Sequence, residues 1–371
     1  MSKTFIELCE INSPSKSERE LALHLSSLFR ELGAAEIIED NSARETGSDS
    51  GNLVIRFAGN ADNMETVFFN CHLDVISPCH NVKVKQLEDG LFTSSGDTVL
   101  GGDDKAGIAI LLETIQSLQE SNMSFGPFEV VLTTCEEIGL LGARFFNPEL
   151  LSAPYGYSLD STGVDNLIAG APAAHSIDID IFGIAAHAGL SPEKGINAIQ
   201  LAGHVLYRFP VGRLDPESTA NIGLINGGKA INIIPDFVNL QGEVRSHSRE
   251  LLGYYLQIYQ DICQQVIGNN YEIGRGDLPS FSFRCPEQYP LMSLSENQPV
   301  IQRALISAAR LDRRLEVIRA GGGSDANFFN HFGVPTAILG VGMDHVHSTS
   351  EQIKLNDMLR TAELVGAILT P

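Results

Sequence analysis

The sequence predicts an α/β protein in which a mostly parallel, mixed sheet lies between helices and a ferredoxin-like α+β domain is inserted. Its 371 residues exceed the size at which a single hydrophobic core usually stops growing, which favours two domains. Strand-like apolar runs alternate with amphipathic helical segments in the first and last parts of the chain. Residues 176–182 instead alternate strictly between polar and apolar side chains, as a half-exposed antiparallel strand does.

The first part of the chain begins with helices between residues 3 and 32, where Leu21, Leu25 and Leu28 fall at helical spacing. A later helix has its apolar positions on one face from Ile108 to Leu118. Strands are expected at 36–39, 52–57, 66–71, 128–135 and 155–159, a short helix at 139–146, and loops at 41–50 and 78–93.

The middle part has the order β-α-β-β-α-β, which is typical of a ferredoxin-like domain. Its strands are expected at 176–182, 222–228, 238–245 and 271–283, and its helices at 197–209 and 250–267. Afterwards the α/β pattern returns, with helices at 299–311, 327–332 and 354–369 and strands at 315–319 and 336–339. We therefore expect a discontinuous main domain of residues 1–174 and 286–371, and an inserted domain of residues 175–285.

The composition excludes several classes of function. A formal net charge of −21 is opposite to what a phosphate backbone requires, so nucleic acid is not an expected partner. No apolar run approaches the roughly 18–20 residues of a membrane helix, and Glu7 stands where a signal peptide would be apolar. The 6 cysteines form no C-x-x-C pair, and reduced thiols are typical of the cytoplasm. We expect a cytoplasmic protein with no membrane partner.

Side chains that can bind a metal follow the ends of several predicted strands. These residues are His72, Glu136, Glu137, Asp160 and His347, together with Asp103 at the start of a helix. Because the carboxyl ends of parallel strands meet at one edge of a sheet, we expect these groups to lie close together. Imidazoles mixed with carboxylates suit zinc, cobalt or manganese. If two metal ions shared one carboxylate, these residues would supply all of their ligands and one acid would remain unbound.

With these motifs the chain resembles the co-catalytic dizinc peptidases that include peptidase T, acetylornithine deacetylase, succinyl-diaminopimelate desuccinylase and glutamate carboxypeptidase. The resemblance extends from about Phe5 to the C-terminus, with the motifs in the family order, and is strongest to the peptidase T-like branch. It depends on LGGDDKAGIA at 100–109, EEIGLLGA at 136–143 and GGGSDAN at 321–327.

The resemblance implies a role for each of these residues. His72 and Asp160 would hold one Zn²⁺, Glu137 and His347 the other, and Asp103 would bridge them. Cobalt or manganese could substitute for zinc, and the peptide bond after Asp103 would be cis. Asp74 would orient His72. Glu136 would be the general base, which takes a proton from the zinc-bridging water that acts as nucleophile and delivers it to the leaving amine. His345 competes with His347, but only His347 is followed four residues later by a Glu, as in the family.

The inserted domain and the glycine turn contain the expected substrate-binding residues. His187 would reach across a dimer interface to stabilise the oxyanion, although a simple loop residue is an equal alternative from sequence alone. Asn232 and Arg245 match substrate-binding positions; Arg245 could clamp a carboxylate or form a surface ion pair. Gly322 and Ser324 are expected to contact substrate, because a phosphate cradle would need the Lys of a P-loop.

The expected function is hydrolysis of an amide bond in short peptides, tripeptides or dipeptides, by a cytoplasmic aminopeptidase. It would act as a homodimer through the inserted lid domain. An N-acyl amino acid deacylase or a carboxypeptidase would use the same metal pair, so the motifs leave this alternative open. A non-catalytic binding protein of the same fold is a further alternative, which the complete ligand set and Glu136 disfavour.

Overall fold

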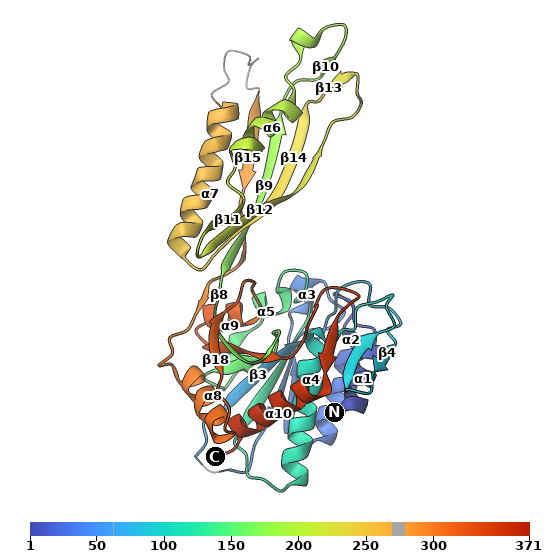
Figure 1. Cartoon of the computed structure of the whole chain (residues 1–371), viewed down its shortest axis with the longest axis vertical. Helices are drawn as coiled ribbons and strands as arrows, with labels where there is room; N and C mark the ends of the chain where they lie inside the picture. Colours follow the sequence, from blue (N-terminus) through green and yellow to red (C-terminus); the bar gives the residue numbers. More distant parts are fainter. Residues whose placement is uncertain (62, 269–278) are drawn as a thin grey trace. The chain divides into compact units, whose positions relative to one another are not determined.

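The computed structural model describes residues 1–61, 63–268 and 279–371 (Figure 1). The chain forms two compact units, one made of Met1–Ala171 with Met292–Pro371 and one made of Pro172–Leu291. These borders lie near, but not at, the expected positions after residues 174 and 285. In the described part of the chain, no helix combines the length and the apolar character needed to cross a membrane.

A mixed sheet forms the centre of the first unit. Its central strands β6, β3, β7 and β19 are parallel, and antiparallel strands flank them on both sides. The order is β1 (Glu36–Glu39), β2 (Leu53–Phe57), β6 (Phe128–Thr133), β3 (Val67–His72), β7 (Gly156–Ser158), β19 (Thr336–Val341), β8 (Val164–Ala171) and β17 (Met292–Ser293), with β18 (Glu316–Arg319) also paired to β8. The predicted α/β class with a mostly parallel central sheet and an inserted domain is confirmed.

Helices cover both faces of this sheet. Successive side chains of a strand point to opposite faces, so neighbouring residues of β3 pack against different helices. Phe69 belongs to the larger core, whereas Phe68 packs edge-on against Phe329 at a centroid distance of 5.0 Å on the other face. The larger core contains α1 (Ser2–Glu10), α2 (Arg19–Glu31), α4 (Gly102–Glu120), α8 (Pro299–Arg310) and α10 (Leu355–Leu369). The other face carries α9 (Ala326–His331); two further short helices are α3 (Ala43–Thr46) and α5 (Leu141–Arg144).

Three segments of the first unit that differ from the sequence prediction affect the count of helices and strands. The loop expected at 41–50 contains the short helix α3. The expected loop at 78–93 contains β4 (Val84–Gln86) and β5 (Leu91–Ser94), which form a small sheet with the distant β20 (Gln352–Lys354). Strand β8 was not predicted, because its sequence VDNLIAGA has no regular alternation and few bulky side chains. β8 and β5 pair with β19 and β20, which lie far away in the sequence, whereas β4 pairs with β5, its neighbour along the chain.

The second unit contains the predicted β-α-β-β-α-β elements and a further strand, β11 (Gly212–Asp215), that precedes β12 (Ser218–Gly227) and was not predicted. The strand order is β11, β12, β14 (Phe237–Ser246), β9 (Ala173–Phe182) and β15 (Ser280–Arg284), with β16 (Glu287–Tyr289) also paired to β9. Helices α6 (Ala198–Arg208) and α7 (Arg249–Cys263) share its core with Ile177, Ile179 and Ile181, as the alternating pattern predicts. Of the strand expected at 271–283, residues 271–278 lie outside the described residues.

Candidate metal centre

The parallel register of the central strands brings the predicted metal-binding residues to one edge of the sheet. His72, the last residue of β3, pairs with Thr133 at the end of β6, three residues before Glu136. Asn70 pairs with Ser158 at the end of β7, and Asp160 follows two residues later. Because these strands run in the same direction, their C-terminal residues and the loops that follow them meet.

Asp103 lies at the centre of the cluster. Its Oδ1 is 3.0 Å from Nε2 of His72, and its Oδ2 is 3.2 Å from Nε2 of His347. Oε2 of Glu137 is 3.0 Å from the same nitrogen of His347, and Oδ1 of Asp160 is 4.0 Å from Nε2 of His72. One carboxylate therefore lies between two groups, each of which contains one imidazole and one further acid.

The cluster contains more carboxylates than imidazoles, and this excess of negative charge shifts the pKa values of both kinds of group. The contacts with Asp103 and Glu137 raise the pKa of His347 to about 10. Burial alone would lower the pKa of His72, but the contact with Asp103 raises it well above its usual value. Burial, strengthened by the negative charge of Asp103, raises the pKa of Asp160 well above its usual value. The cluster therefore favours added positive charge, either protons or cations.

The donor set fits a pair of divalent metal ions. The ligand atoms of His72, Asp103 and Glu137 lie within 4.8 Å of one another. Oε1 of Glu137 is buried and accepts no hydrogen bond from any described residue, so an oxygen remains for an external cation. Mixed imidazole and carboxylate ligands suit zinc, cobalt or manganese.

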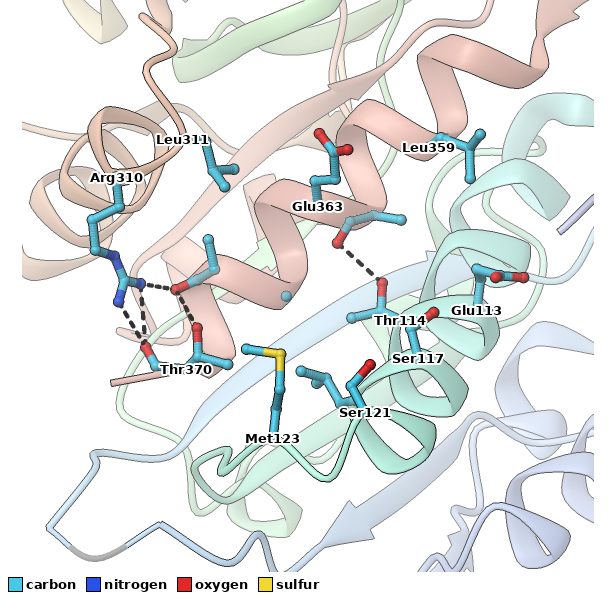
Figure 2. Close-up of a pocket in the computed structure, with 14 residues that line it drawn as sticks. Glu113, Thr114, Ser117, Ser121, Met123, Arg310, Leu311, Leu359, Glu363 and Thr370 are labelled. Atoms are coloured by element: carbon cyan, nitrogen blue, oxygen red, sulfur yellow. Dashed lines mark hydrogen bonds between the residues drawn. The ribbon is translucent and has the colours of Figure 1, made fainter.

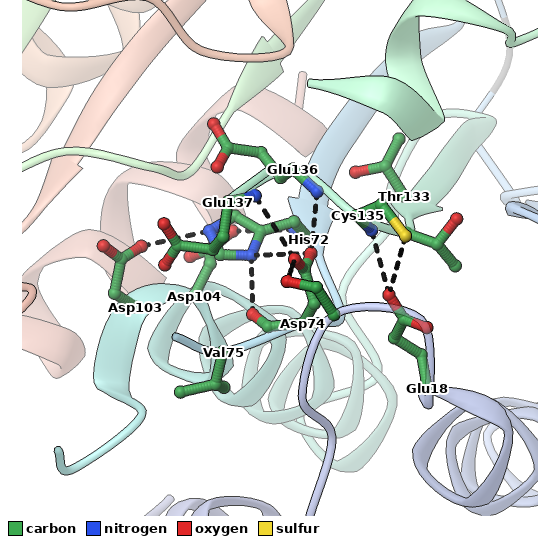
Figure 3. Close-up of polar contacts among 12 residues, drawn as sticks. Glu18, His72, Asp74, Val75, Asp103, Asp104, Thr133, Cys135, Glu136 and Glu137 are labelled. Carbon is green, nitrogen blue, oxygen red and sulfur yellow. Dashed lines mark hydrogen bonds and ion pairs between the residues drawn. The ribbon is translucent and has the colours of Figure 1, made fainter. Parts of the chain in front are cut away.

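The turn that contains Glu136 and Glu137 is bound by a buried carboxylate (Figure 3). The backbone N–H groups of Glu136 and Glu137 donate to Oδ1 and Oδ2 of Asp74, at 2.8 and 3.2 Å. Asp74 contacts His72 as expected, but through its carbonyl oxygen, which is 2.9 Å from Nδ1 of His72; its carboxylate is 3.7 Å from that nitrogen. Asp74 therefore connects His72 to the turn.

Glu351 binds the loop that contains Asp103. Its side chain is 2% exposed, and its carboxylate accepts the N–H groups of Leu100 and Gly101 at 2.8 Å and of Asp103 at 3.0 Å. The peptide bond between Asp103 and Asp104 is cis, as the resemblance implies. Because Glu351 follows His347 by four residues, it joins the two loops whose side chains meet in the cluster.

In the second unit, His187 and Asn232 lie on the same two-stranded ribbon. β10 (Ala186–His187) pairs with β13 (Ile233–Ile234), and the carbonyl oxygen of Asn232 accepts the N–H of Ala188 at 2.9 Å. His187 is exposed, and its Nδ1 accepts the N–H groups of the second and third residues after it, both at 3.1 Å. With Nδ1 as an acceptor, the neutral ring has its proton on Nε2, which is then available as a donor.

The other expected substrate-binding residues make local contacts. Arg245 forms an ion pair with Glu243, with Nε 2.9 Å from Oε1, which is the alternative that the sequence left open. Ser324 is 3% exposed; its N–H donates to Oδ1 of Asn327 at 3.0 Å and its hydroxyl accepts the N–H two residues later at 3.3 Å. Gly322 is half-buried in the same turn.

A separate cavity of about 460 Å³ lies among α4, α8 and α10 (Figure 2). Arg310 at its border donates to the carbonyl oxygens of Ala367 and Thr370, and Thr114 donates to the carbonyl oxygen of Ala362 at 3.3 Å. The predicted site residues are not among those that line it. We therefore regard this cavity as a space between three helices that is separate from the metal centre.

Sequence reasoning did not identify Glu18, Asp104 or Glu351. Glu18 accepts the N–H of Cys135 at 3.0 Å, and Asp104 accepts the N–H of His72 at 3.2 Å. Glu351 gave one signal, its spacing from His347, whereas Glu18 gave none because its partner is more than a hundred residues away.

Three family profiles match parts of the chain. The peptidase dimerisation domain matches residues 170–269, peptidase family M28 matches residues 52–171, and M42 glutamyl aminopeptidase matches residues 296–364. The uncharacterized protein YqjE of Bacillus subtilis is 36% identical over 98% of this chain and 96% of its own length.

Two solved structures are similar over nearly the whole chain. Aminopeptidase PepT from Bacillus cereus shares 35% identity at a TM-score of 0.90, covering 99% of this chain and 96% of its own. A tripeptidase from Staphylococcus aureus shares 34% identity at a TM-score of 0.93, with the same coverage of 99% and 96%.

Proposed function

The chain belongs to the metallopeptidases of the peptidase T type and is a metal-dependent peptide hydrolase, and from this premise we propose that it is an aminopeptidase for short peptides. Tripeptides and dipeptides are the proposed substrates. The observation that carries the hydrolytic part of this proposal is the position of Asp103, whose two oxygens face different imidazoles at 3.0 and 3.2 Å. The choice of short peptides is supported by the similarity to aminopeptidase PepT and to the tripeptidase.

We assign two Zn²⁺ ions to this cluster. His72 and Asp160 would hold one ion, Glu137 and His347 the other, and Asp103 would contact both. When bound, the ions supply Lewis acidity to the scissile carbonyl and lower the pKa of the attacking water. The buried free oxygen of Glu137 supports this assignment, since a lone buried carboxylate oxygen is costly.

Glu136 is the proposed general base. In the protein without metal, burial together with the negative charge of Asp160 raises the pKa of its carboxyl well above the usual value. It takes a proton from the attacking water and delivers it to the leaving amine. Asp74 orients the base by holding the backbone N–H groups of Glu136 and Glu137.

The variant Glu136→Gln tests this function, because it keeps the shape of the side chain and removes the base. We expect kcat for tripeptide hydrolysis to fall about 10²–10⁴-fold while metal content, measured by atomic absorption, stays that of the native protein. Glu149→Gln, an exposed glutamate outside the cluster, is the matched control. Full activity in Glu136→Gln would exclude it as the base.

A substrate panel separates the aminopeptidase from an N-acyl amino acid deacylase or a carboxypeptidase. Free tripeptides and dipeptides would be compared with N-acetyl and N-succinyl amino acids on metal-reconstituted protein. We expect the free peptides to be cleaved from the amino end. Preferential cleavage of the acylated amino acids would replace the proposal with the deacylase.

His187 is proposed to stabilise the oxyanion in the active site of a second copy of the chain. Its Nδ1 is an acceptor, which leaves Nε2–H to donate to the developing charge. The match of residues 170–269 to a dimerisation domain supports a homodimer through the second unit. Asn232 on the same ribbon, together with Arg245, Gly322 and Ser324, is proposed to bind substrate.

For His187→Ala we expect kcat to fall about 10²–10³-fold with unchanged metal content. If the residue acts across a dimer, mixing His187→Ala with the inactive Glu136→Gln variant should restore partial activity, because one site of each mixed dimer regains every group. A rate for His187→Ala equal to the native rate would remove the residue from the site. No recovery on mixing would argue that it acts within its own chain.

We further propose a cytoplasmic location. All 6 cysteines are free thiols, and 5 of them are buried, as is usual in a reducing compartment.

A further inference from the structure

Glu18 is a buried carboxylate outside the proposed metal ligands. It is the residue before α2 and is 0% exposed, but its side chain does not cap that helix. Its Oε1 instead accepts the N–H groups of Cys135 and Lys16, each at 3.0 Å, and its Oε2 accepts the hydroxyl of Ser48 at 2.6 Å. The carboxylate of Glu18 therefore joins three separate segments of the chain, at Lys16, Ser48 and Cys135.

The contact at Cys135 completes a row of three backbone donors. The consecutive N–H groups of residues 135, 136 and 137 all donate to buried carboxylates, the first to Glu18 and the next two to Asp74. Ser15, close to Glu18 in the sequence, donates to Oδ2 of Asp74 at 2.6 Å. The segment 15–18 therefore supplies one of the two carboxylates, Glu18, and binds the other, Asp74, through Ser15. Figure 3 shows Glu18 beside the N–H and the thiol of Cys135.

The backbone at Cys135 determines where the two glutamates point. Cys135 has a φ of 54°, in the left-handed region that favours glycine, and it directly precedes Glu136. Its thiol also contacts Oε1 of Glu18, at 3.3 Å. A side chain in this conformation needs support from its surroundings, and Glu18 supplies it at both the N–H and the thiol.

We propose that Glu18 is a positioning residue for the hydrolytic reaction, which fixes the turn at Cys135 so that the carboxylate of Glu136 is directed at the attacking water. The inference rests on the function proposed above. Glu18, in the segment before α2, would then contribute to catalysis although it contacts neither the substrate nor the metal. The metal ligands His72 and Asp103 are held from other sides, His72 by Asp74 and Asp104 and the Asp103 loop by Glu351. Glu137 shares the turn with Glu136, but its N–H donates to Asp74 and not to Glu18.

The decisive comparison is Glu18→Asp with Glu18→Gln. Aspartate keeps the charge but is one methylene shorter, so it cannot reach Cys135 from the same backbone position. Glutamine keeps the length and can present its oxygen to the two N–H groups and its NH₂ group toward the oxygen of Ser48. Glu39→Asp is the matched control, because Glu39 also lies near the start of α2, where it binds the N–H of Gly51 at 2.9 Å, but does not contact the turn.

Four quantities would be measured for each variant: kcat and KM on a tripeptide, metal ions per chain, and the rate at which iodoacetamide labels Cys135, located by peptide mass spectrometry. For Glu18→Asp we expect kcat to fall about 10- to 100-fold with KM and metal content as in the native protein. We also expect faster labelling of Cys135, whose side chain is 0% exposed in the intact turn. Glu18→Gln and Glu39→Asp should resemble the native protein in all four.

A native kcat in folded Glu18→Asp would overturn the proposal, and so would a loss of kcat that only follows a loss of metal. If Glu18→Asp does not fold, Ser48→Ala replaces it. That variant frees Oε2 of Glu18, and it should lower kcat several-fold at native metal content; a native kcat there would again overturn the proposal. If the native protein hydrolyses no peptide, the proposed function fails, and the labelling of Cys135 still decides whether Glu18 holds the turn.

Discussion

Asp103 shares its carboxylate between two imidazoles. His72 at the end of β3 and His347 in a loop are more than two hundred residues apart, yet both reach the same side chain. Their hydrogen bonds outweigh burial and hold the pKa of Asp103 well below its usual value. The residue is therefore an ionised acceptor on both sides over the whole physiological pH range.

The pKa of His347 gives a prediction for the protein prepared without metal. A pKa raised from 6.5 to about 10 by Asp103 and Glu137 means that the ion pairs stabilise the fold fully below about pH 6.5. This stabilisation is lost as the pH rises through 10. We expect the difference in unfolding free energy between the native protein and His347→Asn to be largest below pH 6.5 and to vanish above pH 10, as measured by urea titration.

His345→Asn is the control for this experiment, because His345 lies 3.6 Å from Asp344, outside the cluster, and its side chain is 61% exposed. A pH dependence equal to that of His347→Asn would mean that the effect is not specific to the cluster. The same pair of variants decides between the two histidines as metal ligand, since only His347→Asn should bind less metal.

At this scale the sequence predicted the residues that follow strand ends and missed those that hold them. His72, Glu137 and Asp160 are identifiable because each follows an apolar run. Glu18 has no local signal, and Glu351 has only its spacing of four residues from His347, because the partners of both are backbone N–H groups of distant loops. A single sequence contains no trace of such a contact.

The side chain of Glu351, from a distant segment, holds the chain at the start of helix α4. Leu100, Gly101 and Asp103 all donate backbone N–H groups to Glu351. Asp103 and Asp104 have non-helical φ and ψ, so these donors precede the regular part of α4 and need an acceptor from outside the helix. A Cβ atom at Gly102 would lie 3.1 Å from Oε1 of Glu351, so glycine fits closely there.

Glu351→Ala should therefore destabilise the first unit by about 3 kcal/mol, because it leaves buried N–H groups without an acceptor. We also expect weaker metal binding, because the Asp103 loop loses its support. Urea unfolding and a metal-binding isotherm would measure both effects. Glu351→Gln, which keeps one acceptor oxygen, should lie between Glu351→Ala and the native protein. Unchanged metal affinity in Glu351→Ala would contradict a role for the residue in placing Asp103.

Among the elements, the sequence predicted those with a strong local pattern. The strand at Phe128–Thr133 and the helix at Gly102–Glu120 are apolar runs whose period identifies them. β8 and the pair β4 and β5 have weak patterns, and their partners β19 and β20 come from the last part of the chain. These strands form because a neighbour supplies hydrogen bonds and burial, which local propensity does not describe.

The largest hydrophobic core of each unit is built from that unit's own residues. One contains side chains from both segments of the first unit, and the other contains only residues of the inserted unit. Every proposed metal ligand lies in the first unit. Metal binding should therefore stabilise one unit and not the other.

Removal of the metal by a chelator should abolish peptide hydrolysis and lower the unfolding temperature of the first unit alone. A ligand present at a thousand times its Kd stabilises the native state by about 4 kcal/mol, which is the loss expected on chelation. Calorimetry combined with hydrogen exchange would assign each transition to its unit. Zinc added back should restore both properties.

An equal fall in both transitions would contradict the separation of the two cores. Unchanged transitions would contradict a metal centre within the first unit.

The discontinuous first unit also has a consequence for biosynthesis. β19 lies between β7 and β8, so the middle of the sheet stays open until the ribosome has translated the entire inserted unit. The inserted unit is continuous in sequence and has a core of its own. It can therefore fold during translation, before the first unit is complete. Because His347 follows β19, a nascent chain acquires its last metal ligand only after the sheet can close.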